Sequence, residues 1–194
     1  MTELRSFVVG GAGFIGSHLV DRLVRRGPVT VFDDLSVGKR QWLEAHVATR
    51  SVELVEADAI ELDKLVDAMR RHAPNVVFHL SANPEARWGL EHTRLDLEQG
   101  TIVTYNVLEA MRRCDVKRVV FASSGTVYGD TTQICREEDL GCLPISLYGA
   151  SKLASEAMVS AFVEWVAGYR EDADAGHGYG RTRLRRTGPS PASA

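Results

Sequence analysis

Short apolar runs alternate along this chain with longer amphipathic segments, and this alternation constrains the fold more than any other feature. In the longer segments leucine, valine or alanine recurs every three or four residues, as on one face of a helix. Such an order is typical of a parallel sheet covered by helices on both faces. Right-handed crossovers then predict an α/β fold with a doubly wound parallel sheet. The predicted strands are Phe7–Val9, Val29–Asp33, Val52–Glu56, Val76–Leu80 and Arg118–Ser123, and the predicted helices span about 14–26, 40–48, 61–72, 96–113 and 149–167.

The composition is that of an ordinary globular protein. The chain has 194 residues, 25% of them charged, and a net charge of −3, which gives no bias toward nucleic acid or membranes. No apolar run reaches the roughly 18 residues of a membrane span, and no signal peptide precedes the first strand, so we expect a cytoplasmic protein. The six histidines show no metal-ligand spacing, and the three cysteines form no C-x-x-C pair. We therefore expect no metal site and reduced, structural thiols at Cys114, Cys135 and Cys142.

After Gly168 the helical periodicity is lost and the sequence becomes rich in glycine and arginine. Such a segment cannot bury enough apolar surface to offset the entropy of ordering it. We predict one folded domain over 1–168 and a disordered tail over 169–194. A nucleic-acid-binding patch is the alternative reading of the tail, but no aromatic residues alternate with its basic residues, so a solvated charge run is favoured. The arginines concerned are Arg181, Arg183, Arg185 and Arg186.

A glycine-rich turn joins the first predicted strand to the first predicted helix. In this setting backbone N–H groups can approach a pyrophosphate, and the amino end of a helix points at it. Gly10, Gly13 and Gly16 fit this need, with Phe14 and Ile15 in the first helical turn, although the G-x-x-G-x-x-G spacing differs by one position from the commonest dinucleotide fingerprint. The turn predicts a Rossmann-type fold that binds a dinucleotide.

Asp33 ends the second predicted strand, seventeen residues beyond Gly16. A carboxylate there can accept hydrogen bonds from the adenosine ribose hydroxyls and repel a 2′-phosphate, so NAD is predicted in preference to NADP. Lys39 and Arg40 follow closely and keep NADP open as the alternative. Asp58, next to Ala59 after the third strand, has two open roles: contact with the adenine edge, or capping of the following helix.

Tyr148 and Lys152 are four residues apart on a predicted helix, so the phenol and the ammonium group share one face. A tyrosine has an ordinary pKa of about 10, and a neighbouring cation is what allows a phenolate to act as a base near neutrality. Ser123 and Ser124 follow the fifth predicted strand, at the edge where open α/β sheets place ligands. A Ser-Tyr-Lys proton relay is the most economical explanation of these residues. His79 ends a buried strand and is expected to be a core or cofactor-edge residue rather than an acid–base catalyst.

These motifs resemble the extended short-chain dehydrogenase/reductase family, and within it the nucleotide-sugar epimerases of the UDP-glucose 4-epimerase type. The resemblance covers most of residues 6–160, in the order and spacing typical of the family. The matching stretches are Gly10–Ser17, Phe32–Leu35, His79–Ala82, Phe121–Gly129 and Tyr148–Lys152.

The resemblance implies a role for each of these stretches. Ser124 would hydrogen-bond the sugar hydroxyl, Tyr148 would remove its proton, and Lys152 would hold the nicotinamide ribose. Leu80, Ser81 and Ala82 would line the cofactor groove. The implied reaction is a 4-epimerisation of a nucleotide sugar, with a UDP-hexose as substrate, through a 4-keto intermediate and a tightly held NAD.

The same resemblance bears on which other reactions of the family this chain could support. Related 4,6-dehydratases have an acidic pair where this chain has Gly125 and Thr126, so dehydration is disfavoured; oxidation and decarboxylation stay open. Relatives also dimerise through helices that correspond to 96–113 and 149–167, which implies a homo-oligomer.

The chain departs from the resembling family in two places. Leu97 stands where relatives usually have an asparagine that contacts the cofactor. The strands and the carboxyl-terminal substrate domain that follow the Tyr-Lys helix in relatives are not found after residue 168, where a frameshift and a naturally short form are both open explanations. A truncated, catalytically incompetent NAD-binding domain is therefore the alternative to an active epimerase.

Overall fold

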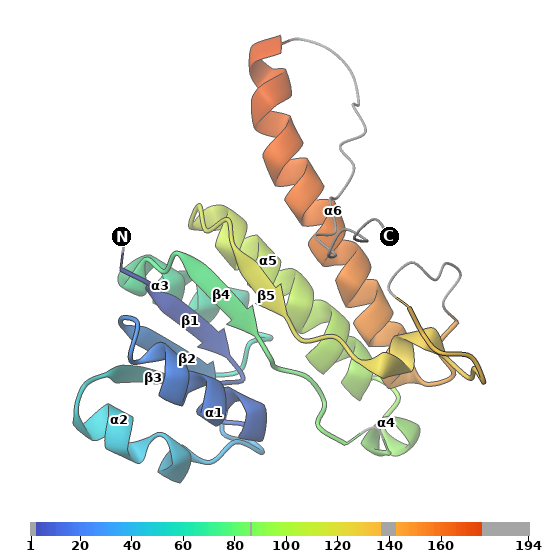
Figure 1. The fold of residues 1–194 in the computed structure, drawn as a ribbon, viewed down its shortest axis with the longest axis horizontal. Helices are drawn as coiled ribbons and strands as arrows, with labels where there is room; N and C mark the ends of the chain where they lie inside the picture. Colours follow the sequence, from blue (N-terminus) through green and yellow to red (C-terminus); the bar gives the residue numbers. More distant parts are fainter. Residues whose placement is uncertain (1–2, 86, 137–142, 176–194) are drawn as a thin grey trace, which may run out of the picture.

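The computed structural model describes residues 3–85, 87–136 and 143–175. Its strands form one sheet in the order β3-β2-β1-β4-β5, and every neighbouring pair is parallel (Figure 1). The predicted doubly wound parallel sheet is confirmed, and each strand begins and ends close to its predicted bounds. The strands are β1 (Ser6–Val9), β2 (Val29–Asp33), β3 (Val52–Glu56), β4 (Val76–His79) and β5 (Val119–Phe121).

The central strands are apolar because helices cover both of their faces. Every residue of β1 and β2 is buried, which explains why these strands read as continuous apolar runs rather than as alternating ones. Strand β5 lies at one edge of the sheet, and its Val120 side chain is exposed.

Helices pack on both faces of the sheet (Figure 1). On one face α1 (Phe14–Leu23) and α2 (Glu44–Ala48) enclose a core that includes Val8, Val20 and Val31. The other face is covered by α3, α5 and α6, around a core that includes Phe7, Phe32, Leu65, Met69 and Val107. These three helices span Leu62–His72, Val103–Arg113 and Leu147–Ala175.

Helix α3 shows how local sequence sets the ends of these elements. Asp63 lies in its first turn, and the basic residues Arg70, Arg71 and His72 lie in its last turn, which matches the helix dipole. The helix ends at Ala73, whose φ of 43° is left-handed, directly before Pro74.

Some predicted helices are divided in the structure. The segment predicted as a helix over 40–48 consists of the 3-10 turn η1 (Arg40–Trp42) followed by α2. The segment predicted over 96–113 begins with a π-helix, η2 (Leu97–Ile102), and continues as α5. Two short elements were not predicted, because four residues are too few to show a period: α4 (Trp88–Glu91) and η3 (Gly125–Tyr128).

Helix α6 continues through Ala175, beyond the predicted domain boundary at 168. Residues 169–175 include alanine, arginine and glutamate, which are strong helix formers, and a single glycine at 168 costs a helix only about 1 kcal/mol. Residues 176–194 lie outside the described residues, and disorder there stays a prediction.

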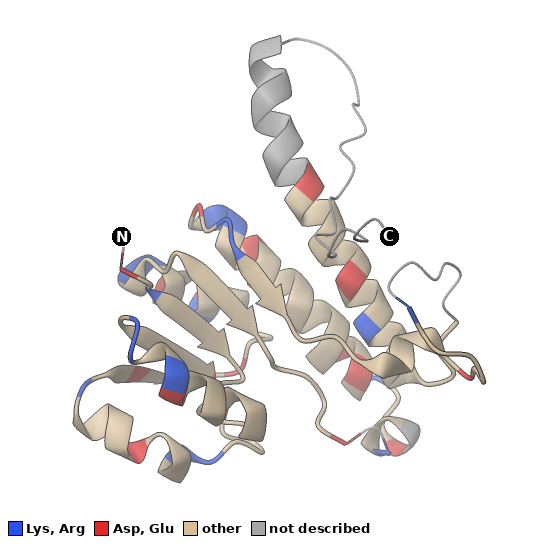
Figure 2. Ribbon diagram, viewed as in Figure 1, with Lys and Arg blue, Asp and Glu red and all other residues tan. Residues whose placement is uncertain are grey.

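Charged residues lie mainly on helices and loops (Figure 2), and β1, β4 and β5 contain none. Within the described residues, no helix is both long enough and apolar enough to cross a membrane. The same residues contain no group of three or more histidine, cysteine or acidic side chains arranged to hold a metal ion. Cys114 and Cys135 are free thiols, and Cys142 lies outside the described residues.

Candidate functional site

Each strand of the sheet delivers a predicted site residue to its carboxyl end. Gly10 follows β1, Asp33 ends β2, Asp58 follows β3, Leu80 follows β4 and Ser124 follows β5. The chain runs outward from β1 through β2 to β3 and then crosses back to β4, so the order of the strands reverses between β1 and β4. Ligands of open α/β sheets bind at such a reversal point.

The three predicted glycines serve three different purposes. Gly10 has a φ of 78°, and a Cβ there would lie 2.7 Å from the backbone nitrogen of Ser81. A Cβ at Gly16 would lie 2.4 Å from the carbonyl oxygen of Gly10, so only glycine lets α1 pack this closely on the turn. Gly13 is the N-cap of α1 and is much less crowded, its nearest neighbour being the Gly10 oxygen at 3.4 Å from the added Cβ.

The turn therefore has the form of a cradle for a pyrophosphate. The Phe14 and Ile15 side chains are exposed, and the N–H groups of a first helical turn have no partner within their own helix. No side chain caps the helix at Gly13. An anion bound there would gain both these N–H groups and the positive end of the helix dipole, so the residues present fit a dinucleotide.

Asp33 is buried and braces the glycine-rich turn. Its Oδ2 accepts a hydrogen bond of 2.8 Å from the Ala12 N–H, and its Oδ1 accepts one of 2.9 Å from the Leu35 N–H. Burial, the largest influence, raises the pKa of Asp33, and the two N–H groups oppose that rise. Each carboxylate oxygen keeps a second lone pair, so the group can still accept hydrogen bonds from a ribose.

The two cations near Asp33 have partners of their own. Arg40 Nη1 lies 3.4 Å from Glu56 Oε2, and Lys39 Nζ lies 5.6 Å from the centre of the Trp42 ring. Neither interaction directs the cation toward Asp33, which favours NAD over NADP at this position.

Asp58 holds the turn that follows β3. Its Oδ1 accepts a hydrogen bond of 2.9 Å from the Ile60 N–H, before α3 begins at Leu62. Asn106 of α5 fastens the same turn, because its Nδ2 donates to the carbonyl oxygens of Ala59 at 3.2 Å and Ile60 at 2.8 Å. Asp58 thus closes a turn before α3 and does not cap the helix, whose N-cap is Glu61 without a side-chain hydrogen bond; contact with adenine stays a prediction.

Leu80, Ser81 and Ala82 continue β4 beside the glycine-rich turn. The Leu80 N–H donates to the Val9 carbonyl at 2.9 Å, and the Ser81 backbone faces Gly10. All three residues are half-buried. The structure therefore brings them to the predicted groove.

Lys152 is buried at the end of β5, with only 3% of its surface exposed. Its Nζ donates to the Ala122 carbonyl at 2.8 Å and lies 4.8 Å from the centre of the Phe121 ring and 5.8 Å from that of Tyr148. Burial lowers the pKa of Lys152 to about 8. The predicted tyrosine and lysine therefore lie side by side, with the cation largely removed from water.

Ser124 is the N-cap of η3, and its Oγ accepts hydrogen bonds from the N–H and the hydroxyl of Thr126 at 3.2 and 2.9 Å. The first turn of α6 packs tightly against this segment, since a Cβ at Gly149 would lie 2.8 Å from the Thr126 carbonyl oxygen. The structure thus brings the Ser124 segment against the helix that carries Tyr148. The neighbouring Ser123 hydroxyl donates to Glu156 of α6.

Thr104 and Ser155, which the sequence reasoning missed, form a buried polar cluster beside Lys152 with His79, which was expected in the core. His79 Nε2 and Ser155 Oγ each lie 3.0 Å from Thr104 Oγ1, and Thr104 Oγ1 donates to the Gly100 carbonyl at 2.7 Å. His79, Thr104 and Ser155 are each at most 1% exposed. The signal of Thr104 and Ser155 in the sequence is a polar residue at a core-facing helical position, which only the packing of the helix reveals.

A second buried pair lies in the loop after the groove. Asn83 Nδ2 donates to Asp96 Oδ1 at 2.9 Å, and the two residues are 4% and 2% exposed. Leu97, the residue expected to replace a polar cofactor contact, is exposed, whereas Gly100 of the same π-helix is buried against Ser151.

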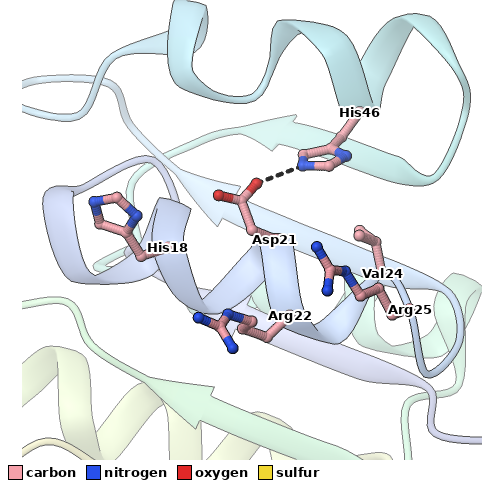
Figure 3. Close-up of a pocket in the computed structure, with 6 residues that line it drawn as sticks. All are labelled: His18, Asp21, Arg22, Val24, Arg25 and His46. Atoms are coloured by element: carbon pink, nitrogen blue, oxygen red, sulfur yellow. Dashed lines mark hydrogen bonds and ion pairs between the residues drawn. The ribbon is translucent and has the colours of Figure 1, made fainter.

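A surface hollow lies elsewhere, between α1 and α2 (Figure 3). There His46 Nε2 lies 2.6 Å from Asp21 Oδ1. The lining contains no predicted site residue, and the chemistry at the strand ends gives a better candidate site than this hollow. Its lining residues are His18, Asp21, Arg22, Val24, Arg25 and His46.

Comparison with known proteins identifies the family of the chain. The sequence pattern of the NAD dependent epimerase/dehydratase family matches residues 6–167. The chain belongs to this family. Its cofactor is accordingly NAD, and solved structures similar to this epimerase/dehydratase fold contain NAD.

The relatives include several epimerases. The UDP-glucose 4-epimerase of Mycolicibacterium smegmatis is 35% identical over 161 residues, which cover 82% of this chain and 51% of the relative. The UDP-glucose 4-epimerase structure from Thermus thermophilus, a complex with NAD, has a TM-score of 0.76 and 34% identity over 86% of this chain and 52% of that one. A UDP-N-acetyl-alpha-D-glucosaminuronate decarboxylase of Bacillus cytotoxicus is 34% identical over 76% of this chain and 43% of its own.

The chain spans about half the length of the curated relatives that it matches. Family membership therefore establishes an NAD-dependent epimerase/dehydratase fold and the cofactor. Family membership does not decide which reaction the chain supports, because epimerases and a decarboxylase are similar to this chain at nearly the same identity.

Proposed function

We propose that this chain is the NAD-binding half of a nucleotide-sugar epimerase of the UDP-glucose 4-epimerase type, with Ser124, Tyr148 and Lys152 as its reacting groups. The observation that carries the proposal is the buried ammonium group of Lys152, which lies beside the Tyr148 ring at the carboxyl ends of the strands. A buried lysine without an anionic partner is costly, so a fold keeps one where its charge is used.

The residues divide the work of proton transfer. Tyr148, on the first turn of α6, would take the proton of the sugar hydroxyl as general base. Lys152, one turn later, would stabilise the phenolate by its charge and hold the nicotinamide ribose. Ser124 would hydrogen-bond the same sugar hydroxyl and orient it.

NAD, when bound, would supply the redox chemistry: it would accept hydride from C4 of the sugar and return it to the opposite face of the 4-keto sugar. Gly10, Gly13 and Gly16 would hold its pyrophosphate, and Asp33 its adenosine ribose. Leu80, Ser81 and Ala82 would line the groove between these two contacts and the reacting groups.

The second candidate is an NAD-binding domain that does not turn over by itself. It is favoured by the length of the chain, which is about half that of its relatives. A UDP-hexose as substrate and a second copy of the chain as partner are proposed only for the first candidate, the epimerase.

One experiment separates the two candidates. Purified protein is assayed for bound NAD and for conversion of UDP-galactose to UDP-glucose, with Tyr148→Phe as the inactive control. Turnover that is lost in the variant supports the epimerase. NAD binding without turnover supports the second candidate, and absence of NAD binding contradicts both.

A further inference from the structure

The first turns of α6 bury polar side chains against α5 and the sheet, although the buried side of a helix is normally apolar. Ser151, Lys152 and Ser155 are 6%, 3% and 0% exposed. Burying hydroxyl groups costs free energy unless each finds a partner. Further along the same helix Met158, Val159 and Phe162 pack against the core in the ordinary way. Among the side chains of α6 described up to residue 164, the buried polar residues are thus confined to the turns around Lys152.

The hydroxyl of Thr104 lies at the centre of the hydrogen bonds made by these buried polar groups. It donates to the Gly100 carbonyl at 2.7 Å, so its single proton is used and its oxygen accepts from the other neighbours. One of these is His79 Nε2, at 3.0 Å. The other is Ser155 Oγ, also at 3.0 Å, whose single proton is shared between Thr104 Oγ1 and the Ser151 carbonyl at 2.8 Å.

This arrangement fixes the state of His79. Its Nε2 must carry the proton, and its Nδ1 is buried without a hydrogen-bond partner among the described residues. A histidinium needs an acceptor at both nitrogens, and here one has none. Burial, and then the charge of Lys152, lower the pKa of His79 to about 3. His79 is therefore a constant neutral donor at neutral pH, which suits a structural link rather than acid–base chemistry.

The link joins three elements. His79 ends β4, Thr104 lies in the first turn of α5, and Ser155 lies on α6, three residues beyond Lys152. The π-helical turn before α5 lets Gly100 lie directly against α6, since a Cβ at Gly100 would lie 2.6 Å from Ser151 Oγ. The contacts on both sides of Lys152 leave α6 little freedom to slide or rotate.

We propose that Thr104 is a positioning residue for Lys152: its hydroxyl ties the end of β4 to α6 and so holds the ammonium group at the Ala122 carbonyl beside Tyr148. The functional importance of this position rests on the proposed function. The positioning itself is a property of the chain alone and is tested without cofactor or sugar.

The test measures the titration of Lys152 directly. The chain has four lysines, Lys39, Lys64, Lys117 and Lys152. Labelling the lysines with a carbon-13 nucleus at Cε gives one NMR signal for each, and Lys152→Arg identifies the signal that is lost. Thr104→Val keeps the size of the side chain and removes the hydroxyl, whereas Thr104→Ser keeps the hydroxyl.

If the hydroxyl positions Lys152, Thr104→Val releases the ammonium group toward water and its titration midpoint rises by about one pH unit or more. Thr104→Ser keeps the midpoint of the unmodified protein. Val20→Ala, in the core on the opposite face of the sheet, serves as a control that lowers stability without moving the midpoint.

An unchanged midpoint in folded Thr104→Val overturns the proposal, and so does an equal rise in Val20→Ala. If Thr104→Val does not fold, Ser155→Ala decides by the same criterion, because it cuts the link at the α6 end. None of these outcomes depends on whether the chain catalyses an epimerisation.

Discussion

Lys152 shows how a proposed reacting group can oppose the stability of its own fold. Its folded pKa, about 8, lies below the ordinary value of 10.5, because burial disfavours the charged form. Between these two values the unfolded chain binds more protons than the native chain, so stability rises with pH across this window. Below pH 8 the native state bears the full cost of the buried charge, of the order of 3 kcal/mol.

Lys152→Met is accordingly expected to stabilise the fold at pH 7 by about 1–3 kcal/mol, because it removes the buried charge and keeps the packing. The advantage should shrink between pH 8 and 10.5. Urea unfolding at pH 7 and pH 10 measures both effects. Lys117→Met, at a lysine whose side chain is 56% exposed, is the matched control with little expected change. A Lys152→Met protein less stable at pH 7 contradicts the expectation.

Tyr148→Phe is expected to reduce turnover about 100-fold or more and to leave NAD affinity nearly unchanged, because only the proton-transfer group is lost. The variant is assayed in whatever form turns over, including one joined to the second half of a relative. Tyr105→Phe, on the exposed side of α5, is the control. Retention of most activity in Tyr148→Phe removes this residue from the mechanism.

Asp33 is expected to set the choice of cofactor. We expect calorimetric titration to show tighter binding of NAD than of NADP. Asp33→Asn should weaken NAD binding about tenfold and narrow the difference between the two cofactors, since it removes the charge that attracts ribose hydroxyls and repels a 2′-phosphate, together with one of the two oxygens that accept from the Ala12 and Leu35 N–H groups. Asp34→Asn is the neighbouring control, because the Asp34 carboxylate accepts from Ser36 instead. Equal or tighter NADP binding by the unmodified protein defeats the assignment.

At the scale of elements, the sequence predicted the strands and helices from their periodic patterns, and it missed individual buried polar residues. Apolar runs and periodic helices placed every strand, and the glycine-rich turn and the Tyr-Lys spacing located the candidate site. Thr104, Asn106 and Ser155 were missed because a polar residue on a helix is normally assigned to the solvent side. Their role depends on which neighbouring element they meet, and that is decided by packing. The π-helix η2 was missed for a different reason, because its sequence continues the period of α5.

The glycine-rich turn gives a test in which two glycines of one element differ. Gly16→Ala should destabilise the fold by about 1–3 kcal/mol, because its Cβ would meet backbone atoms at 2.4–2.8 Å. Gly13→Ala meets only ordinary contact and should leave stability within about 0.5 kcal/mol. Its added methyl group should nevertheless weaken NAD binding at the cradle. Thermal unfolding and calorimetric titration of both variants check the contrast, and equal destabilisation would show that the turn has room at Gly16.

At the scale of the molecule, large apolar side chains remain exposed near the candidate site. Ile134, Leu143 and Ile145 are 87%, 79% and 79% exposed, and Val120 on the edge strand is 51% exposed. Solvent-exposed apolar groups and an uncovered edge strand favour association. The same region follows β5, at the carboxyl side of the sheet.

We therefore expect the chain to self-associate and to be marginally stable by itself. Light scattering over a range of concentrations should show species larger than a monomer, and Ile145→Ser with Leu143→Ser should reduce them. A monodisperse monomer with cooperative unfolding would show that these side chains are tolerated in water.

The order of the strands also governs how the chain can fold during synthesis. Strand β1 is made first but is central in the sheet, between β2 and β4. Its pairing with β4 joins residues seventy positions apart, such as Ser6 and Val76. Until β4 leaves the ribosome, β1 presents an open edge of apolar residues, and such non-local closure is slow. The first strand of the nascent chain thus needs protection from other chains until β4 has been made.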